Sequence, residues 1–589
     1  MYTILENARI VIKLLKEHNI RNIVLSPGGS NIPIVQGVQQ DPFFNCYSIV
    51  DERSAMYFAI GLYLSTGEPV ATSCTTANAT RNYIPGLTEA FYKHAPILAI
   101  TMSKHPMYLS QEYMQCPIQT SLPVDAVKKS YSLPRINNEY DRQLCIRTAN
   151  EAILELTHHS YGPVQLNIEE LDSETWHFDK MMDELPSVRT IRRYKCKDIN
   201  LCNELKSKKI LLLVGEHRPF SNENISSIEA FCEKFDVCVY CNHISNYHGK
   251  YSIQANLLLA AMDQKVFDEM LSPDVIISIG GITGDYAVYG KLFSTNDSPI
   301  EHWRVSEDGD VVDTYNKLTR VYEGSIEDFF KQNIDYRDNE HGYWEKWNSL
   351  LGDISYNVDV PFSNIYAAQQ LCKKIPENSF MNYAILNSLR SWLYFPISPT
   401  IKAFSNVASF GIDGCMSTFI GESVTTDELC FLIIGDLSFF YDMNAIGIRH
   451  INNNVRILLV NNNGGVEFKL GGLQENTDVG SFIAADGHFK NAEGWAKTQG
   501  FIYLSAHNKE EFEKNRECFI EKSDQPIIFE LFTNEDDERR ANYLLVDANR
   551  HETRNNELKG NLKKTVKGII GNDNAAKLGG LLRSRNTKV

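Results

Sequence analysis

The sequence lacks several features that would place it in a specialised class of protein. No apolar run is long enough to cross a bilayer, and residues 1–20 mix charged and apolar positions without the apolar core of a secretion signal. The 13 cysteines are scattered and lack metal-finger spacing, so reduced thiols are expected. We therefore expect a cytoplasmic protein with no transmembrane segment.

The charge and the glycine pattern exclude two further classes. The net charge of −16 disfavours a nucleic-acid-binding body, because a polyanion would be repelled. Gly280, Gly281 and Gly284 follow an apolar run, but they do not form the GxGxxG pattern of a dinucleotide site. Bound FAD is therefore not expected. At 589 residues, several domains are required.

Apolar runs alternate with helical patterns through most of the chain, and each run ends in small or polar residues. This order predicts an α/β protein built from three doubly wound parallel-sheet domains. We place them at residues 1–185, 190–340 and 355–545, with a polar and aromatic linker from Asp335 to Trp347. A basic C-terminal tail follows at 546–589, and its residues 559–589 carry a net charge of +7. The tail could lie on an anionic membrane, dock on a partner, dock on the protein's own acidic surface or be disordered.

The most informative motif lies in the third domain. Asp436 follows the apolar run 430–434, and Asn463, which is 27 residues further on, follows the run 457–460. These runs predict parallel strands joined by a helix, so the two side chains would meet at adjacent strand ends. An aspartate and an asparagine there can hold one hard cation that also takes phosphate oxygens. The pattern predicts a magnesium-diphosphate anchor, with the following helix N-terminus facing the phosphate.

Glu52 is a second candidate, in Asp51-Glu52-Arg53-Ser54-Ala55, where an extended segment turns into a helix. A carboxylate at this position can simply stabilise the helix N-terminus. Alternatively, it can act on a cofactor whose diphosphate is held by the Asp436 motif. The sequence pattern alone leaves both interpretations open.

The chain resembles the thiamine-diphosphate-dependent 2-oxo-acid decarboxylases and carboligases over about residues 1–540. One branch is especially similar, because Leu437 and Asp442-Met443-Asn444 follow Gly435-Asp436. That branch contains the menaquinone-pathway synthase, which decarboxylates 2-oxoglutarate and adds the product to isochorismate. Further matching segments are Ser26-Pro27-Gly28, Asp51–Ala55, Asn387-Ser388-Leu389, Gly411–Gly414 and Asn461–Gly465.

The resemblance implies a role for each matching residue. Glu52 would hydrogen-bond N1′ of the aminopyrimidine ring and favour the imino tautomer that takes the thiazolium proton, and Gln115 would face the reacting centre. Ile412 would hold the bent cofactor by wedging between its two rings. Mg²⁺ would be bound by Asp436, Asn463 and the carbonyl of Gly465. The remaining cofactor contacts would come from Ser388, Gly435, Leu437, Ser438 and Asn463.

The substrate positions depart from the synthase pattern. Arginines of that branch are replaced by Ser30, Trp392 and the run Asn406-Val407-Ala408, and another is replaced by Lys104. Guanidinium groups grip carboxylates in bidentate fashion, which a lysine cannot do. A less acidic substrate pair, such as pyruvate and a sugar-like carbonyl acceptor, would suit the remaining candidates, which are Ser30, Asn31, Arg81, Lys104, Arg390 and Trp392. For Glu467 and Lys469, solvated surface positions explain the sequence as well as a role in the site does, and for His488 the indication of a role in the site is weaker still.

We therefore predict an enzyme that decarboxylates a 2-oxo acid and transfers the acyl-anion equivalent to an acceptor, using thiamine diphosphate and Mg²⁺. Alternatives are the menaquinone-pathway synthase itself, a simple decarboxylase that releases aldehyde, and a non-catalytic scaffold protein. In this superfamily the cofactor lies between two subunits, which implies an obligate homodimer or homotetramer. Small-molecule substrates are the expected partners, and nucleic acid is not.

Overall fold

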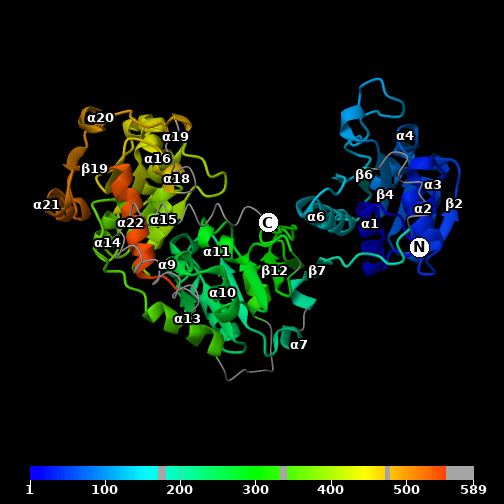
Figure 1. The fold of residues 1–589 in the computed structure, drawn as a ribbon, viewed down its shortest axis with the longest axis horizontal. Helices are drawn as coiled ribbons and strands as arrows, with labels where there is room; N and C mark the ends of the chain where they lie inside the picture. Colours follow the sequence, from blue (N-terminus) through cyan, green and yellow to red (C-terminus); the bar gives the residue numbers. More distant parts are fainter. Residues whose placement is uncertain (170–180, 199–200, 297, 332–340, 471–477, 552–589) are drawn as a thin grey trace, which may run out of the picture. The chain divides into compact units, whose positions relative to one another are not determined.

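The computed structural model describes the chain except residues 170–180, 199–200, 297, 332–340, 471–477 and 552–589 (Figure 1). The described strands form three parallel sheets with helices between them, which confirms the predicted fold class. The chain divides into two compact units, Met1–Ile199 with Phe293–Phe329, and Asn200–Leu292 with Phe330–Val589. The three-domain boundaries stay predictions, and the basic tail beyond residue 551 lies outside the described residues.

The first sheet has six strands in the order β2-β1-β3-β4-β6-β5. Its strands are β1 (Asn22–Leu25), β2 (Asn45–Ser48), β3 (Val70–Cys74), β4 (Ile97–Ser103), β5 (Ser130–Leu133) and β6 (Val164–Glu169). Its helices are α1 (Glu6–Glu17), α2 (Ile32–Gln39), α3 (Glu52–Thr66), α4 (Asn78–Asn82), α5 (Ile84–Tyr92) and α6 (Glu139–Glu155).

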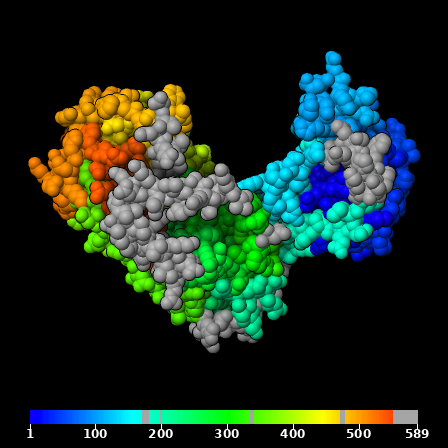
Figure 2. Space-filling view, viewed as in Figure 1, coloured from blue at the N-terminus to red at the C-terminus, as the bar shows by residue number. Residues whose placement is uncertain are grey.

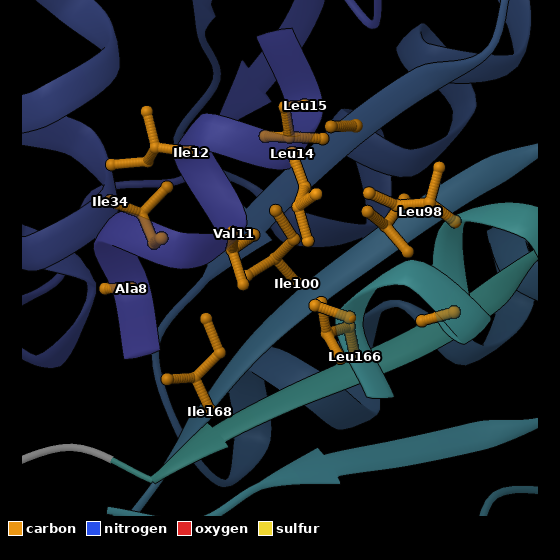
Figure 3. Close-up of a cluster of buried hydrophobic side chains, with 14 of the residues drawn as sticks. Ala8, Val11, Ile12, Leu14, Leu15, Ile34, Leu98, Ile100, Leu166 and Ile168 are labelled. Atoms are coloured by element: carbon orange, nitrogen blue, oxygen red, sulfur yellow. The ribbon is translucent and has the colours of Figure 1, made fainter. Parts of the chain in front are cut away.

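The core of this domain forms because α1 is amphipathic and lies against a sheet whose central strands are buried on both faces. The helix carries its apolar residues at helical spacing, and the central strands β4 and β6 are entirely buried. Figure 3 shows the resulting contact between helix and sheet, in which the labelled side chains are Ala8, Val11, Ile12, Leu14, Leu15, Ile34, Leu98, Ile100, Leu166 and Ile168.

The second sheet has seven strands in the order β10-β9-β8-β11-β12-β13-β7. Its strands are β7 (Arg192–Lys195), β8 (Ile210–Val214), β9 (Val237–Tyr240), β10 (Ser252–Ile253), β11 (Val275–Ile279), β12 (Glu301–Ser306) and β13 (Leu318–Glu323). The helices of this region are α7 (Leu201–Leu205), α8 (Asn222–Cys232), α9 (Asn256–Ala261), α10 (Gln264–Met270), α11 (Tyr286–Leu292), α12 (Ile326–Phe330) and α13 (Gly342–Gly352).

Helix α13 corrects the predicted linker. The segment from Asp335 was expected to connect two domains, but its described end, from residue 342 to 347, is helical. Tyr343 and Trp347 are buried, and the Tyr343 hydroxyl donates to the Leu271 carbonyl at 2.7 Å. The aromatic residues that looked like linker composition are one turn apart, so they form the apolar stripe by which α13 packs.

The third sheet has six strands in the order β15-β14-β16-β17-β19-β18. Its strands are β14 (Phe380–Tyr383), β15 (Lys402–Ser405), β16 (Cys430–Gly435), β17 (Val455–Asn461), β18 (Ile502–Ala506) and β19 (Ile527–Phe532). Its helices are α14 (Asn364–Leu371), α15 (Asn387–Leu393), α16 (Cys415–Ser423), α17 (Asp436–Tyr441), α18 (Val466–Leu470), α19 (Asp478–Ile483), α20 (Glu493–Thr498), α21 (Lys509–Ile520) and α22 (Glu535–Ala548).

The longest helix that the structure describes is α6, with 17 residues. Among the described helices, none combines the length and apolar character that a membrane crossing requires.

Candidate active site

The predicted metal motif lies where two neighbouring strands of the third sheet end. β16 and β17 are parallel, with Gly435 opposite Val460. Asp436 follows β16 directly and begins α17, while Asn461 ends β17. The parallel register brings the two strand ends together, as predicted, at the edge of the sheet where α/β proteins bind ligands.

Asp436 is buried and its carboxylate is held on both oxygens. Oδ1 accepts from the backbone N–H of Leu437 at 2.7 Å, and Oδ2 accepts from that of Gly464 at 3.1 Å. Nε2 of His488 lies 3.0 Å from Oδ2. Burial raises the pKa of Asp436, and the bond to His488 opposes that rise. A carboxylate fixed in this way is suited to a cation.

His488 is the residue that the sequence analysis left undecided and the structure brings to the site. Its Nδ1 accepts from the backbone N–H of Lys490 at 2.9 Å. Nδ1 therefore has no proton, so Nε2 carries it and donates to Asp436. The ring packs edge-on against Phe440, with centroids 5.4 Å apart. His488 therefore holds the Asp436 carboxylate in one orientation.

Three consecutive asparagines lie at the end of β17 and in the turn after it, and their surroundings differ. Nδ2 of Asn461 donates to Glu530 Oε1 at 2.7 Å and to the Lys490 carbonyl at 2.8 Å, so this side chain braces the turn. Asn463 has a left-handed backbone, with φ 62°. Oδ1 of Asn462 is buried without a hydrogen-bond partner. Such an unsatisfied oxygen is an available ligand for a hard cation.

A cavity of about 170 Å³ opens at these strand ends. It gathers every cofactor and metal residue predicted in this domain except Asn463, namely Ser388, Ile412, Gly435, Asp436, Leu437, Ser438 and Gly465. Asn462 and Gly464 also line it. Ser438 Oγ donates to the Ile412 carbonyl at 2.6 Å, which ties the start of α17 to the Ile412 loop. The cavity and its oxygen donors fit Mg²⁺ with a bound diphosphate.

Glu52 begins α3 in the other unit. The capping role that competed with catalysis in the sequence is performed by Asp51, whose Oδ1 accepts from the backbone N–H groups of Arg53 at 3.0 Å and Ser54 at 3.4 Å. The Glu52 carboxylate instead accepts from Nδ2 of Asn82 at 3.1 Å. Glu52 is therefore not the helix cap, although it lies in the first turn of α3, where a carboxylate also stabilises the helix N-terminus.

Gln115 lies in the long segment between β4 and β5, which stands out from the rest of its domain (Figure 1 and Figure 2). It is exposed, with φ 58°. The nearby Gln119 anchors the segment: its Oε1 accepts from the Ala77 N–H at 2.9 Å, and its Nε2 donates to the Met102 carbonyl at 2.7 Å. A buried glutamine that bonds to two backbone groups was not recognisable from the sequence.

The predicted substrate residues of this unit have different surroundings. Asn31 is fully buried and its Nδ2 donates to the Ser26 carbonyl at 2.9 Å, so it holds the loop in place. Ser30 hydrogen-bonds Thr75. Arg81 is exposed and donates to the Ile118 carbonyl at 3.2 Å, and Lys104 is half-buried after β4.

In the other unit, the predicted substrate residues Trp392 and Arg390 also have different surroundings. Trp392 is fully buried, and its indole N–H donates to Asn364 Oδ1 at 3.0 Å. The structure thus gives Trp392 a place in the core. Arg390 forms two hydrogen bonds with Glu467, at 2.5 and 2.6 Å.

A buried carboxyl group, that of Glu538, accepts a hydrogen bond from a residue that lines the cavity. Glu538 on α22 is 2% exposed and accepts from the Asn364 N–H at 2.9 Å and from Thr533 Oγ1 at 2.8 Å. Asn364 lines the cavity and donates to the Asn387 carbonyl at 3.1 Å. Burial raises the pKa of Glu538 from 4.5 to about 7.

This group makes stability depend on pH. Because the folded-state pKa lies above the unfolded one, the contribution of Glu538 is fully present below pH 4.5 and is lost as pH rises through about 7. We expect Glu538→Gln, which mimics the neutral acid, to raise the free energy of unfolding at pH 8 by about 3 kcal/mol and to leave it unchanged at pH 4. Urea unfolding at both pH values measures this. Asp536→Asn, which alters an exposed carboxylate of the same helix, should show no such difference; equal pH profiles for Glu538→Gln and the wild type would contradict the assignment.

Comparisons with known proteins agree with this geometry. The family model "Thiamine pyrophosphate enzyme, N-terminal TPP binding domain" matches residues 6–122. The 2-succinyl-5-enolpyruvyl-6-hydroxy-3-cyclohexene-1-carboxylate synthase of Bacteroides thetaiotaomicron is 33% identical over 559 residues, covering 92% of this chain and 98% of the relative. The synthase of Phocaeicola vulgatus is 33% identical over 555 residues, covering 91% and 97%.

A more distant synthase, from Flavobacterium johnsoniae, is 27% identical and covers 89% of this chain and 96% of its own. The solved structure titled "X-ray structure of a putative thiamin diphosphate-dependent enzyme isolated from Mycobacterium smegmatis" covers 90% of this chain and 99% of its own, at 15% identity and a TM-score of 0.42, and no argument rests on it. The identity to the synthases extends over nearly the whole chain. The chain is a thiamine-diphosphate-dependent enzyme and belongs to the family of the 2-succinyl-5-enolpyruvyl-6-hydroxy-3-cyclohexene-1-carboxylate synthases.

Proposed function

We propose that this enzyme decarboxylates a 2-oxo acid of low charge, such as pyruvate, and transfers the remaining acyl fragment to a carbonyl acceptor. Thiamine diphosphate, when bound, supplies the electron sink that allows carbon dioxide to leave. The observation that carries the proposal is the cavity at the ends of β16 and β17, where the buried Asp436 carboxylate and the unpartnered Asn462 oxygen lie together.

The residues of this cavity would divide the work of holding the cofactor. Asp436 would bind Mg²⁺ together with Asn463, the Gly465 carbonyl and the available Asn462 oxygen. Leu437 and Ser438 would contact the diphosphate. Exclusion of bulk water from the cavity would strengthen each of these interactions.

Glu52 would act at the other end of the cofactor. Its carboxyl group would hold a proton at N1′ of the aminopyrimidine ring, and this favours the tautomer that removes the reacting proton. Asn82, which already donates to this carboxylate, would keep it oriented. Gln115 would face the reacting carbon, where it would help to decide the fate of the acyl fragment.

We further propose that each site needs two chains, one supplying Glu52 and the other supplying Asp436. Exposed apolar side chains in both units support an assembly that covers them. On α3 these include Tyr57, Phe58 and Leu64, at 46%, 41% and 64% exposure, and near the third sheet they include Phe482 and Phe489, at 88% and 80%.

The menaquinone-pathway reaction is the second candidate, because the relatives at 33% identity carry that synthase's name. This reaction requires side chains that bind the two carboxylates of 2-oxoglutarate and side chains that bind isochorismate. Against it, Ser30 and the buried Trp392 occupy positions where the resemblance places arginines.

Carbon dioxide release from a panel of 2-oxo acids tests the choice. The protein is supplied with thiamine diphosphate and Mg²⁺, with and without acceptors that include isochorismate and short hydroxyaldehydes. We expect the highest kcat/KM with pyruvate or another monocarboxylic acid, by about tenfold or more over 2-oxoglutarate. Preferred turnover of 2-oxoglutarate with isochorismate would establish the second candidate instead. Aldehyde release without an acceptor would identify a simple decarboxylase.

A further inference from the structure

Arg390 and Glu467 form a two-pronged ion pair at the edge of the candidate active site. Nη1 of Arg390 donates to Oε1 of Glu467 at 2.5 Å, and Nη2 donates to Oε2 at 2.6 Å. Their side chains are only 24% and 19% exposed. A planar guanidinium matched to a carboxylate by two short bonds is a strong, directional arrangement. The pair joins residues 77 positions apart, on α15 and α18.

The pair lies beside the cofactor cavity. Glu467 lines that cavity, two residues after the Gly465 of the metal turn. Arg390 lines a smaller neighbouring cavity with Tyr286, Asp285 and Tyr394. The carboxylate that faces the active site is therefore held by a guanidinium that lies behind it.

The other groups near Arg390 do not replace Glu467 as the charged partner of its guanidinium. Nη2 of Arg390 also donates to Oδ1 of Asn387 at 3.4 Å, but the asparagine side chain carries no charge. Asp285 is engaged by the Tyr240 hydroxyl and by Asn256 Nδ2 at 2.7 Å, so it does not compete for the guanidinium. Glu467 is therefore the carboxylate that pairs with the Arg390 guanidinium.

The lining of the cavity has a consequence for charge. Among its described residues there is no lysine, arginine or histidine, and its charged members are the carboxylates Asp436 and Glu467. Asp436 is the proposed ligand of the cation. The side of the cavity formed by Glu467, with Arg390 bonded to it, is called the wall below. A second carboxylate on a substrate that reached this wall would lie against the carboxylate of Glu467. It could bind the Arg390 guanidinium only after both hydrogen bonds between Arg390 and Glu467 were broken.

We propose that the Arg390–Glu467 pair determines donor specificity: it makes this wall of the site neutral and selects a 2-oxo acid without a second carboxylate. The inference rests on the proposed function and assigns its preference for a 2-oxo acid with one carboxylate to these two residues. Arg390 acts through Glu467, as a positioning residue. Specificity arises because the wall offers no unpaired positive charge to a dicarboxylic acid.

Glu467→Gln tests the proposal, because it keeps the shape of the side chain and one acceptor oxygen but removes the charge that neutralises Arg390. In the thiamine-diphosphate- and Mg²⁺-loaded protein, we expect the ratio of kcat/KM for 2-oxoglutarate to that for pyruvate to rise at least about tenfold, the effect of one charge-assisted hydrogen bond. The matched control is Glu513→Gln, which removes the carboxylate from the Arg516 ion pair on α21, outside the cavity, and should leave the ratio unchanged.

A binding measurement separates this inference from the proposed function. Titration calorimetry of the loaded protein with unreactive glutarate and propionate requires no turnover. Glu467→Gln should bind glutarate about tenfold more tightly than the wild type, with propionate unchanged. The double variant Arg390→Leu/Glu467→Leu, whose wall is again neutral, should bind glutarate no better than the wild type does.

The outcomes are distinct. Equal glutarate binding by the wild type and Glu467→Gln would overturn the inference, as would a wild type that uses 2-oxoglutarate at least as well as pyruvate. Neither result would affect the assignment of decarboxylation. Release of carbon dioxide from no acid, with any acceptor, would overturn the proposed function, while the glutarate titration would still decide the charge of the wall.

Discussion

Asp436→Asn is expected to weaken Mg²⁺-dependent binding of thiamine diphosphate by about 100-fold or more, because the hard cation loses its carboxylate ligand. Asparagine retains the shape of the side chain and an oxygen that can accept from Leu437, so the fold should persist. Calorimetric titration with thiamine diphosphate at fixed Mg²⁺ measures the affinity, and circular dichroism checks the fold.

The control for this variant is Asp427→Asn, in the exposed turn that precedes β16 at the opposite end of the strand. It also removes one negative charge but should leave the affinity for thiamine diphosphate within about twofold. Unchanged binding by Asp436→Asn would mean that the cavity at β16 and β17 does not hold the metal.

Glu52→Gln is expected to reduce turnover by a factor of about 10² to 10⁴, the range of a lost general acid–base group, while the affinity for thiamine diphosphate stays near that of the wild type. Glutamine can accept a hydrogen bond from Asn82 but cannot hold and release a proton at N1′. Steady-state carbon dioxide release with the best donor acid gives the rate, and calorimetry gives the affinity. Glu68→Gln, an exposed glutamate just beyond α3, should leave both unchanged.

The two variants together test the shared site. If each site takes Glu52 from one chain and Asp436 from another, a mixed dimer of Glu52→Gln and Asp436→Asn chains contains one intact site. Co-expression should then restore about a quarter of the wild-type activity, since half of the dimers are mixed and each has one of two sites. Activity that stays at the level of the single variants would show that the two residues act within one chain or in different sites.

The strands and the position of the metal motif could be predicted from local sequence. The runs 430–434 and 457–460 are continuous and apolar because a central parallel strand is buried on both faces, and they lie within β16 and β17. The linker prediction failed because composition was used where spacing decides: Tyr343 and Trp347 are one helical turn apart.

The partners of the site residues could not be predicted in the same way. His488 and Asp436 are 52 positions apart, and Arg390 and Glu467 are 77 apart. Neither separation leaves a local periodic signal. Trp392 was proposed for the substrate because of its position in a motif, yet its helix turns the side chain into the core toward Asn364.

The sequence by itself determined the α/β architecture and the position of the Asp436 motif, because both depend on short patterns of apolar residues and ligand types, and its resemblance to a known family implied the cofactor class. Only the tertiary structure decided which groups surround the motif: His488 on the Asp436 carboxylate, Asp51 rather than Glu52 as the helix cap, and Glu467 across the Arg390 guanidinium. The physical reason is that backbone periodicity is encoded over a few residues, whereas charge neutralisation and hydrogen bonding in a buried site depend on side chains that meet only when distant strands and helices pack together.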